Sequence, residues 1–252
     1  LSLTLFILTI FIYFLTAHLR HIENPDDKIV PTASEMLDGI KRVTIQKDRK
    51  GDLRLWVDTL ASGKRFFISL FLLGFAVILG LNMGVFPIIE HFFLRFITFF
   101  DKIPALAVLP ILFIVFGLGE TSKIALILIG VFPTIALDTY LRAKGIPKEQ
   151  ITKGLTLGAS DIEIAYKVVL PQILPGVLDT IRLNFKAMIL FLIAGESLAA
   201  TVGLGYRIFV IRRYIAMDII IPYVIWMSLL AFLMDLLVRL WIKKGYSWTV
   251  KN

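Results

Sequence analysis

Long apolar segments constrain this chain more than any other feature of its sequence. A helix needs about 20 mostly apolar residues to cross the hydrocarbon core of a bilayer, and a backbone in lipid has no water to bond. With 58% hydrophobic and 18% charged residues among 252, the sequence predicts an all-α, polytopic membrane protein of about six transmembrane helices. The expected spans are residues 1–17, 66–85, 103–118, 123–137, 177–202 and 219–241.

Changes in polarity divide the chain into three expected parts. Residues 1–19 form the first transmembrane helix, and residues 20–65 form a polar loop. Residues 66–248 form a membrane core, which contains a second polar loop at 145–171. The core is therefore expected to carry five of the spans and one large excursion out of the membrane.

The first polar loop combines charges with two amphipathic segments. It contains a turn cluster at 24–27 and a run of charges at 47–52, and short amphipathic helices are expected to begin near Pro31 and near Leu53. Nothing in the sequence assigns a function to the charged insertion at 41–54.

Charge and residue content exclude several kinds of site. The chain has no cysteine, so it has no disulfide and no thiolate metal site. His18, His21 and His91 lack partners at ligand spacing, so no metal site is expected. The net charge of +8 lies mostly in loops beside apolar runs, where it indicates orientation and contact with membrane lipids rather than nucleic acid.

Residues 154–171 are predicted to form a helical hairpin. Gly158 is the expected turn, because glycine accepts the left-handed backbone that ends one helix before another starts. Ser160 and Glu163 have the spacing of a capping box for the second helix, and Pro171 is expected to end it.

The distribution of lysine and arginine bears on orientation. Six spans place the hairpin and the C-terminus on one side, and Lys148, Lys153, Lys243 and Lys244 indicate that this side is cytoplasmic. The basic residues of the loop at 41–65 argue against this orientation, although the rule is weaker for a loop of that length.

Three ordered motifs carry a resemblance that covers about residues 30–248. They are Gly158-Ala159-Ser160 followed by Leu170-Pro171, Ile103-Pro104 to Leu109-Pro110 followed by Phe116-Gly117-Leu118-Gly119-Glu120, and Gly195-Glu196-Ser197 followed by Gly203-Leu204-Gly205-Tyr206. Together they resemble the permease subunits of type I ABC importers, within the branch that handles nitrate, sulfonate, taurine and bicarbonate. The membrane core would then have the type I importer permease fold.

The resemblance implies that the loop at 145–171 is a coupling helix that docks on a separate ATPase subunit. One departure is that the acidic-alanine-alanine triplet of the family falls here on Thr152-Lys153-Gly154, so the acidic residue of the triplet is absent. The coupling residues that the resemblance implies are Gly154, Leu155, Gly158, Ala159, Ser160, Asp161, Glu163, Leu170 and Pro171.

The resemblance also implies partners. The chain has no GxxxxGK[ST] phosphate-binding loop, so it is expected to be a non-catalytic subunit without a cofactor. ATP and magnesium would be used by two copies of the ATPase subunit. A periplasmic or lipid-anchored binding protein would deliver a small anionic solute, and a second permease copy would complete the pore in a bacterial inner membrane. The sequence does not identify the solute, and it leaves a heterodimeric pore open.

Charged residues of the fifth span are candidates for the translocation path. Arg182 and Lys186 share a helix face, and Glu196 lies near the far end of the span. The alternative interpretation is that Arg182 and Lys186 reach the headgroups, with Asp179 as a partner.

Two other functions compete with an ATP-driven importer. An ion-coupled secondary transporter would need acidic residues deep in the membrane, and Glu196 is the one serious candidate. A membrane enzyme would need clustered catalytic side chains at helix ends, and the sequence shows no such cluster.

Overall fold

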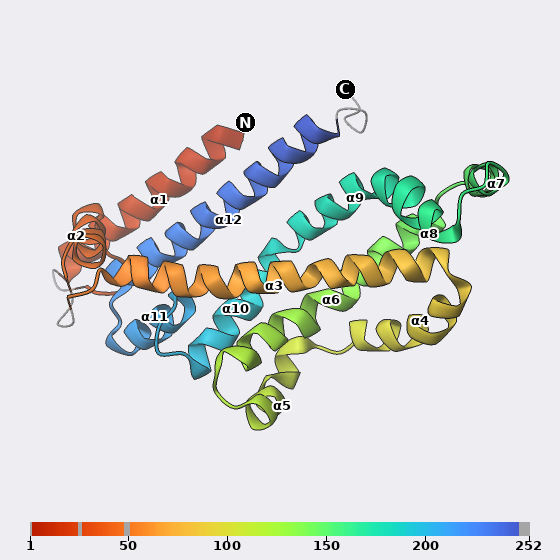
Figure 1. Cartoon of the computed structure of the whole chain (residues 1–252). Helices are drawn as coiled ribbons and strands as arrows, with labels where there is room; N and C mark the ends of the chain where they lie inside the picture. The colour runs from red at the N-terminus through yellow and green to blue at the C-terminus, as the bar shows by residue number, and fades with distance from the viewer. Residues whose placement is uncertain (1, 25–26, 48–50, 247–252) are drawn as a thin grey trace. The chain divides into compact units, whose positions relative to one another are not determined.

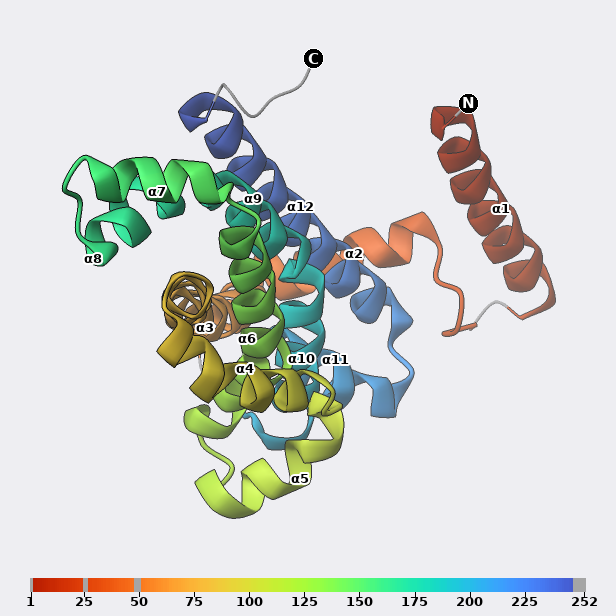
Figure 2. The same cartoon turned by 90° about the vertical axis from the view of Figure 1, so that its right-hand side faces the viewer.

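A computed structural model describes residues 2–24, 27–47 and 51–246, and in these ranges the regular structure is entirely helical (Figures 1 and 2). This confirms the predicted all-α class. The helices are α1 (Ser2–Glu23), α2 (Ala33–Thr44), α3 (Arg54–Val85), α4 (Pro87–Asp101), α5 (Ala105–Phe116), α6 (Glu120–Lys144), α7 (Lys148–Thr156), α8 (Asp161–Glu163), the π-helix η1 (Ile164–Val169), α9 (Leu170–Leu183), α10 (Phe185–Ala199), α11 (Leu204–Ile211), the 3-10 helix η2 (Arg212–Tyr214) and α12 (Met217–Gly245).

The chain divides into two compact units. The first unit contains Leu1–Ser62 and Glu196–Leu229, and the second contains Gly63–Gly195 and Leu230–Asn252. Helices α3, α10 and α12 each run through a boundary between these ranges. Each unit nevertheless has its own internal packing.

Close contact between α3 and α6 organises the core of the second unit. A Cβ atom on Gly80 would lie 2.3 Å from the backbone oxygen of Ala136, and one on Gly84 would lie 2.4 Å from the Cβ of Ala143. Small residues that let two helix backbones approach are the usual packing device of membrane helices. The buried side chains around this contact are Leu73, Ala76, Met83, Ile127, Val131, Ile135, Phe185, Met188 and Leu192.

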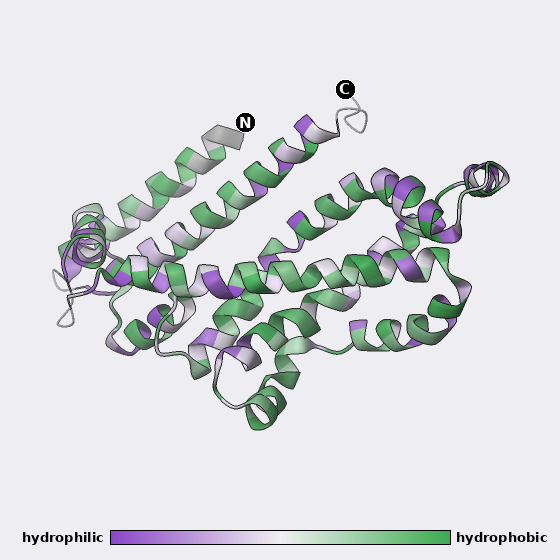
Figure 3. Ribbon diagram, viewed as in Figure 1, coloured by the Kyte–Doolittle hydropathy of each residue, from purple (hydrophilic) through white to green (hydrophobic). Residues whose placement is uncertain are grey.

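Hydropathy identifies which described helices can cross a membrane. Helices α3, α6 and α12 are each long and apolar enough, and two bent pairs raise the number to five if each pair is one span. The pairs are α4 with α5, and the helix from Asp161 to Ala199 with the segment from Leu204 to Tyr214. Figure 3 shows hydrophobic residues along α3 and α6, whereas hydrophilic residues gather at α7 and α8. The predicted first span coincides with α1, and its role as a sixth span stays a prediction.

The third predicted span, residues 103–118, differs from the structure. Helix α5 contains only 12 residues, and its axis is bent by 102° from that of α4. Pro104 precedes α5 in an extended conformation. Proline lacks a backbone N–H and disfavours a helical residue before it, which fits the end of α4 at Asp101. The apolar run is therefore part of a bent pair.

The first unit contains the predicted amphipathic helix near Pro31, which is α2. Thr32 caps it: the Thr32 side chain accepts from the Glu35 N–H, and the Glu35 carboxylate accepts from the Thr32 N–H at 2.7 Å. The Thr32 backbone hydrogen bond lowers the pKa of Glu35. The amphipathic segment predicted near Leu53 is the start of α3. The turn at 24–27 and the charge run at 47–52 lie partly outside the described residues.

The α3–α6 contact can be tested with two glycines of one helix. Gly80→Ala should destabilise the protein by about 1–3 kcal/mol, because the new methyl group overlaps the α6 backbone. Gly74→Ala is the matched control, since a Cβ there meets no atom within 4 Å, and it should be neutral or stabilising by up to about 1 kcal/mol. Unfolding followed by tryptophan fluorescence in detergent measures both, and equal effects would contradict the close contact.

Candidate functional site

The predicted hairpin is present between α6 and α9. Helix α7 is followed by a turn and then by α8, at the end of the second unit where α6 ends and α9 begins (Figure 1). Gly158 has a φ of 89°, which L side chains rarely adopt. A Cβ at this position would meet no atom within 4 Å. The turn therefore requires glycine for its backbone conformation and not for space.

The predicted capping box is also present. The Ser160 hydroxyl accepts a hydrogen bond from the Glu163 N–H at 3.3 Å, and the Glu163 carboxylate accepts one from the Ser160 N–H at 3.1 Å. Lys167 donates to the same carboxylate at 2.8 Å. The Lys167 hydrogen bond, followed by those of Ser160, lowers the pKa of Glu163 to about 2. The second helix of the hairpin thus starts at a fixed residue.

The expected helix end at Pro171 is wrong. Helix α8 continues through η1 into α9, and Pro171 lies in the first turn of α9. In η1 the Leu170 N–H bonds to the Ala165 oxygen, five residues back. The wider π turn sits directly before the proline, where a backbone N–H is lacking. The hairpin is therefore joined to the membrane segment by an unbroken helix.

Gly154 explains part of the departure in the first hairpin helix. A Cβ on Gly154 would lie 2.4 Å from the Cδ1 of Ile164, whose side chain is 1% exposed. Glycine at this position lets η1 pack directly against α7. An alanine, as the family triplet has, would require Ile164 to move.

The outer side of the hairpin exposes apolar side chains. Leu155, Leu157 and Ile162 are 43%, 80% and 64% exposed. Asp161 and Ala159 lie in the same turn region, with Asp161 exposed and Ala159 partly buried. Apolar side chains on a polar loop are typical of a surface that contacts another protein.

Two of the three candidate path residues belong to the second unit. Arg182 donates to Asp179 at 2.6 Å and to Asp235 at 2.5 Å, and only 11% of its side chain is exposed. The predicted pairing with Asp179 is thus present, and Arg182 also ties α9 to α12. Lys186 is exposed. Two further ion pairs at helical spacing, Asp138 with Arg142 and Asp235 with Arg239, are present as well.

Glu196 belongs to the first unit and is fully buried. Its carboxylate accepts from the Ser62 hydroxyl at 2.7 and 2.9 Å and from the Gly205 N–H at 2.8 Å. Gly203 has a φ of 139°, and a Cβ there would lie 2.6 Å from the Glu196 carboxylate. Glu196 therefore holds the turn at 203–205.

Asp58 is a second buried carboxylate at the same turn, and the sequence analysis missed it. It accepts from the Gly203 N–H at 2.9 Å, from Arg207 at 2.7 Å and from Tyr223 at 3.1 Å. The sequence signal that could have indicated it is spacing: Asp58 lies four residues before Ser62, on the same helix face.

A further ion cluster in the second unit was also missed. Arg65 donates to Glu120 at 2.5 and 2.8 Å, and Lys123 donates to the same carboxylate at 3.0 Å. The sequence signal for this ion cluster was Glu120, an acidic residue at the start of α6 directly after the aromatic-glycine turn. In the described ranges, no three His, Cys, Asp or Glu side chains lie close enough to hold a metal ion.

Comparison with known proteins decides the family. The family model described as "Binding-protein-dependent transport system inner membrane component" matches residues 72–244. The chain belongs to this family. It is a non-catalytic, multi-pass permease subunit of an ABC transporter, and the predicted resemblance is confirmed.

Individual relatives agree with this family. The permease is 32% identical over 189 residues to the taurine transport system permease protein TauC of Escherichia coli, covering 75% of this chain and 69% of the relative. It is 26% identical over 222 residues to the putative aliphatic sulfonates transport permease protein SsuC of Bacillus subtilis, covering 87% and 78%. A structure of the MetNI methionine ABC transporter shares the fold, with a TM-score of 0.61 and 20% identity, covering 75% of this chain and 95% of that one.

The buried carboxylate of Glu196 gives one prediction. Glu196→Ala should destabilise the permease by about 1–3 kcal/mol, because the Gly205 N–H and the Ser62 hydroxyl lose a buried acceptor. Glu149→Ala removes an exposed carboxylate from α7 and should change stability by less than about 0.5 kcal/mol. Thermal unfolding measures both, and equal stability of the two variants would contradict the buried network.

The hairpin cap gives a second prediction. A lowered pKa means that the Glu163 carboxylate stabilises the cap fully above about pH 4.5, and that this contribution is lost as the pH falls through about 2. At pH 4 the amide of Glu163 should still exchange slowly in hydrogen-exchange mass spectrometry. Ser160→Ala should speed exchange at the start of α8 at every pH, whereas Thr156→Ala at the end of α7 should not. Fast exchange of the unmodified hairpin at pH 4 would disprove the cap.

Proposed function

We propose that this permease is the membrane subunit of an ATP-driven importer for a small anionic solute. The observation that carries the proposal is the hairpin. It lies outside the predicted spans, its second helix starts at the Ser160–Glu163 cap, and it exposes Leu155, Leu157 and Ile162. A separate ATPase subunit that uses ATP and magnesium supplies the surface that covers these side chains.

The unbroken helix after the hairpin supports a mechanical role. From Asp161 the backbone remains helical through η1 and α9 to Leu183, and α10 follows after Asn184. Asn82 donates to the Tyr166 hydroxyl at 2.9 Å, which ties η1 to α3. A displacement of the hairpin by the ATPase subunit therefore reaches two spans directly. In this proposal the coupling surface comprises Gly154, Leu155, Gly158, Ala159, Ser160, Asp161 and Glu163, and Leu170-Pro171 connects it to α9.

The class of solute follows from two relatives. TauC is named for taurine and SsuC for aliphatic sulfonates, and both names describe compounds with a sulfonate group. Lys186, exposed on α10, supplies a positive charge for such an anion in the path. Arg182 and Glu196 are already engaged in ion pairs or buried hydrogen bonds, so they act in the path through the helices they hold.

The assembly is proposed by the same argument. Two permease copies enclose the path, two ATPase subunits bind the two hairpins, and a periplasmic or lipid-anchored binding protein delivers the solute in a bacterial inner membrane. In this proposal residues 1–19 form an added span, residues 20–65 a loop, and residues 66–248 the permease domain. Membership in a binding-protein-dependent family favours this assembly over an ion-coupled secondary transporter.

Replacing the glycine of the hairpin turn tests coupling. Gly158→Trp should leave membrane insertion intact and uncouple ATP hydrolysis from uptake, because the side chain strains the turn and keeps the ATPase from the hairpin. Gly51→Trp is the matched control, since Gly51 also has a left-handed backbone, with a φ of 85°, and lies in the first polar loop. Uptake and phosphate release are measured in proteoliposomes with the ATPase and binding protein. Normal uptake by Gly158→Trp would refute the assignment.

A further inference from the structure

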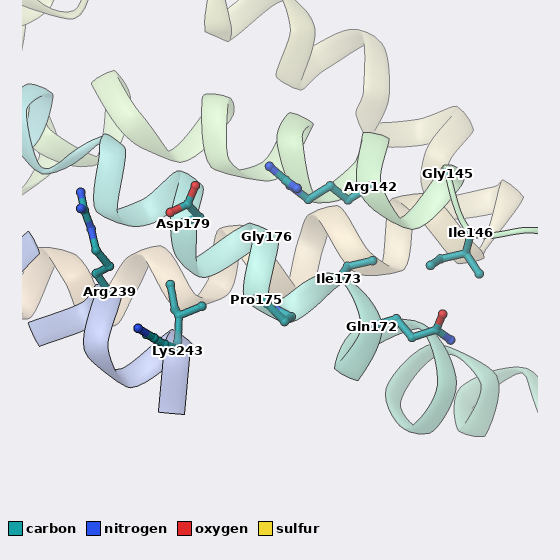
Figure 4. A pocket seen from close by; sticks show the side chains of 11 residues that line it. Arg142, Gly145, Ile146, Gln172, Ile173, Pro175, Gly176, Asp179, Arg239 and Lys243 are labelled. Atoms are coloured by element: carbon teal, nitrogen blue, oxygen red, sulfur yellow. The ribbon is translucent and has the colours of Figure 1, made fainter. Parts of the chain in front are cut away.

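A pocket of about 710 Å³ lies beside the hairpin in the second unit. Gly145 and Ile146, directly before the hairpin, and Gln172 and Ile173, directly after it, line one end. Helices α6, α9 and α12 line the rest (Figure 4). The pocket is therefore at the base of the hairpin, where its two ends join the spans.

Basic side chains from two helices enter this pocket. Arg142 comes from the end of α6, and Arg239 and Lys243 come from the end of α12, while Asp179 of α9 is the acidic lining residue (Figure 4). The rest of the lining is largely apolar and includes Ile146, Ile173, Pro175 and Ile242. Ligand pockets are commonly apolar with a few charged or polar groups that set specificity, and three basic side chains against one acidic one favour a ligand with an anionic group.

The position of Arg142 is fixed by its surroundings. Its Nε donates to Asp138 at 2.6 Å and its Nη2 donates to the Thr180 hydroxyl at 3.1 Å. A Cβ on Gly176 would lie 2.2 Å from Nη1, so only glycine leaves room for the guanidinium against α9. A guanidinium carries five N–H donors, and two of them make the hydrogen bonds above. The structure gives the other N–H groups no hydrogen-bond partner among the described residues.

The charge balance favours an anion. Asp179 is paired with Arg182, and Arg239 is paired with Asp235 at 3.3 Å. With Asp138 bound to Arg142, the three acidic groups are each matched by an arginine. Lys243 has no ion pair within the part of the chain that the structure describes, and it leaves one positive charge over in the pocket.

We propose that this pocket binds an oxyanion, of the phosphate or sulfonate type. The planar guanidinium of Arg142 matches two oxygens of such a group, and the Lys243 ammonium supplies the balancing charge. Two sources have this chemistry: the phosphate of a membrane phospholipid headgroup and a free oxyanion in solution. The proposal does not depend on the ATP-driven import proposed above.

Selective protection of Lys243 from acylation tests the site. The full-length permease is purified in a phosphate-free maltoside detergent, with sodium sulfate or with sodium chloride at equal ionic strength. A third sample contains phosphatidylglycerol and sodium chloride. Mass spectrometry then compares the acylation rate of Lys243 with that of Lys244, the adjacent residue that does not line the pocket.

The samples distinguish the two sources. Selective slowing at Lys243 in sulfate assigns the pocket to a free oxyanion, and slowing only with phosphatidylglycerol assigns it to a lipid headgroup. Equal slowing of both lysines indicates general charge screening and overturns the proposal. Slowing of Lys243 in neither sample overturns it as well.

Three variants distinguish a specific binding site from non-specific electrostatic attraction of anions. Arg142→Gln should weaken protection on the order of tenfold or more, as expected for a lost charge-assisted hydrogen bond. Gly176→Ala keeps every charge but displaces the guanidinium, so it should also weaken protection. Lys148→Gln removes a charge from α7 outside the pocket and should leave protection unchanged. If Lys148→Gln weakens protection as much as Arg142→Gln does, the site is refuted. Size-exclusion profiles identify any variant that fails to fold, and Arg142→Lys then replaces Arg142→Gln as a variant that keeps the charge and loses the planar donors.

Discussion

Backbone hydrogen bonding in lipid is the constraint on which the rest of this structure depends. Each N–H and C=O in the hydrocarbon must bond within the chain, and an unpaired group there costs several kcal/mol. Helices meet this demand residue by residue, and all regular structure in the described ranges is helical. Where the backbone is irregular, side chains can supply the missing acceptors. The turn at 203–205 illustrates this, because Asp58, Ser62 and Glu196 accept its three successive N–H groups.

The same constraint explains what could be predicted from the sequence. Apolar runs predict α3, α6 and α12, since periodicity and length act locally. The hairpin turn and its cap follow from Gly158, Ser160 and Glu163, because a left-handed backbone and a capping box depend on residues within one turn. Local chemistry therefore located the candidate site.

Features that depend on long-range partners could not be predicted. Glu196 is a predicted path residue, yet its carboxylate accepts hydrogen bonds from Ser62, 134 residues earlier, and from Gly205. The bend before α5 depends on Pro104, but its angle depends on the packing of α4 and α5 against α6. Pro171 was expected to end a helix, since sequence alone does not indicate a π turn placed before a proline.

The π turn changes how the hairpin relates to the membrane. A helix stopped at Pro171 would leave a flexible joint between the hairpin and α9, and a joint absorbs displacement. In η1 the hydrogen bond from Leu170 to Ala165 spans that position instead, and buried Ile164 and Val169 pack the turn against its neighbours. Gly154 allows Ile164 to occupy that place. Gly154, which departs from the family pattern in α7, and Pro171, which follows η1, therefore both belong to a stiff connection. It joins an exposed surface to a membrane helix.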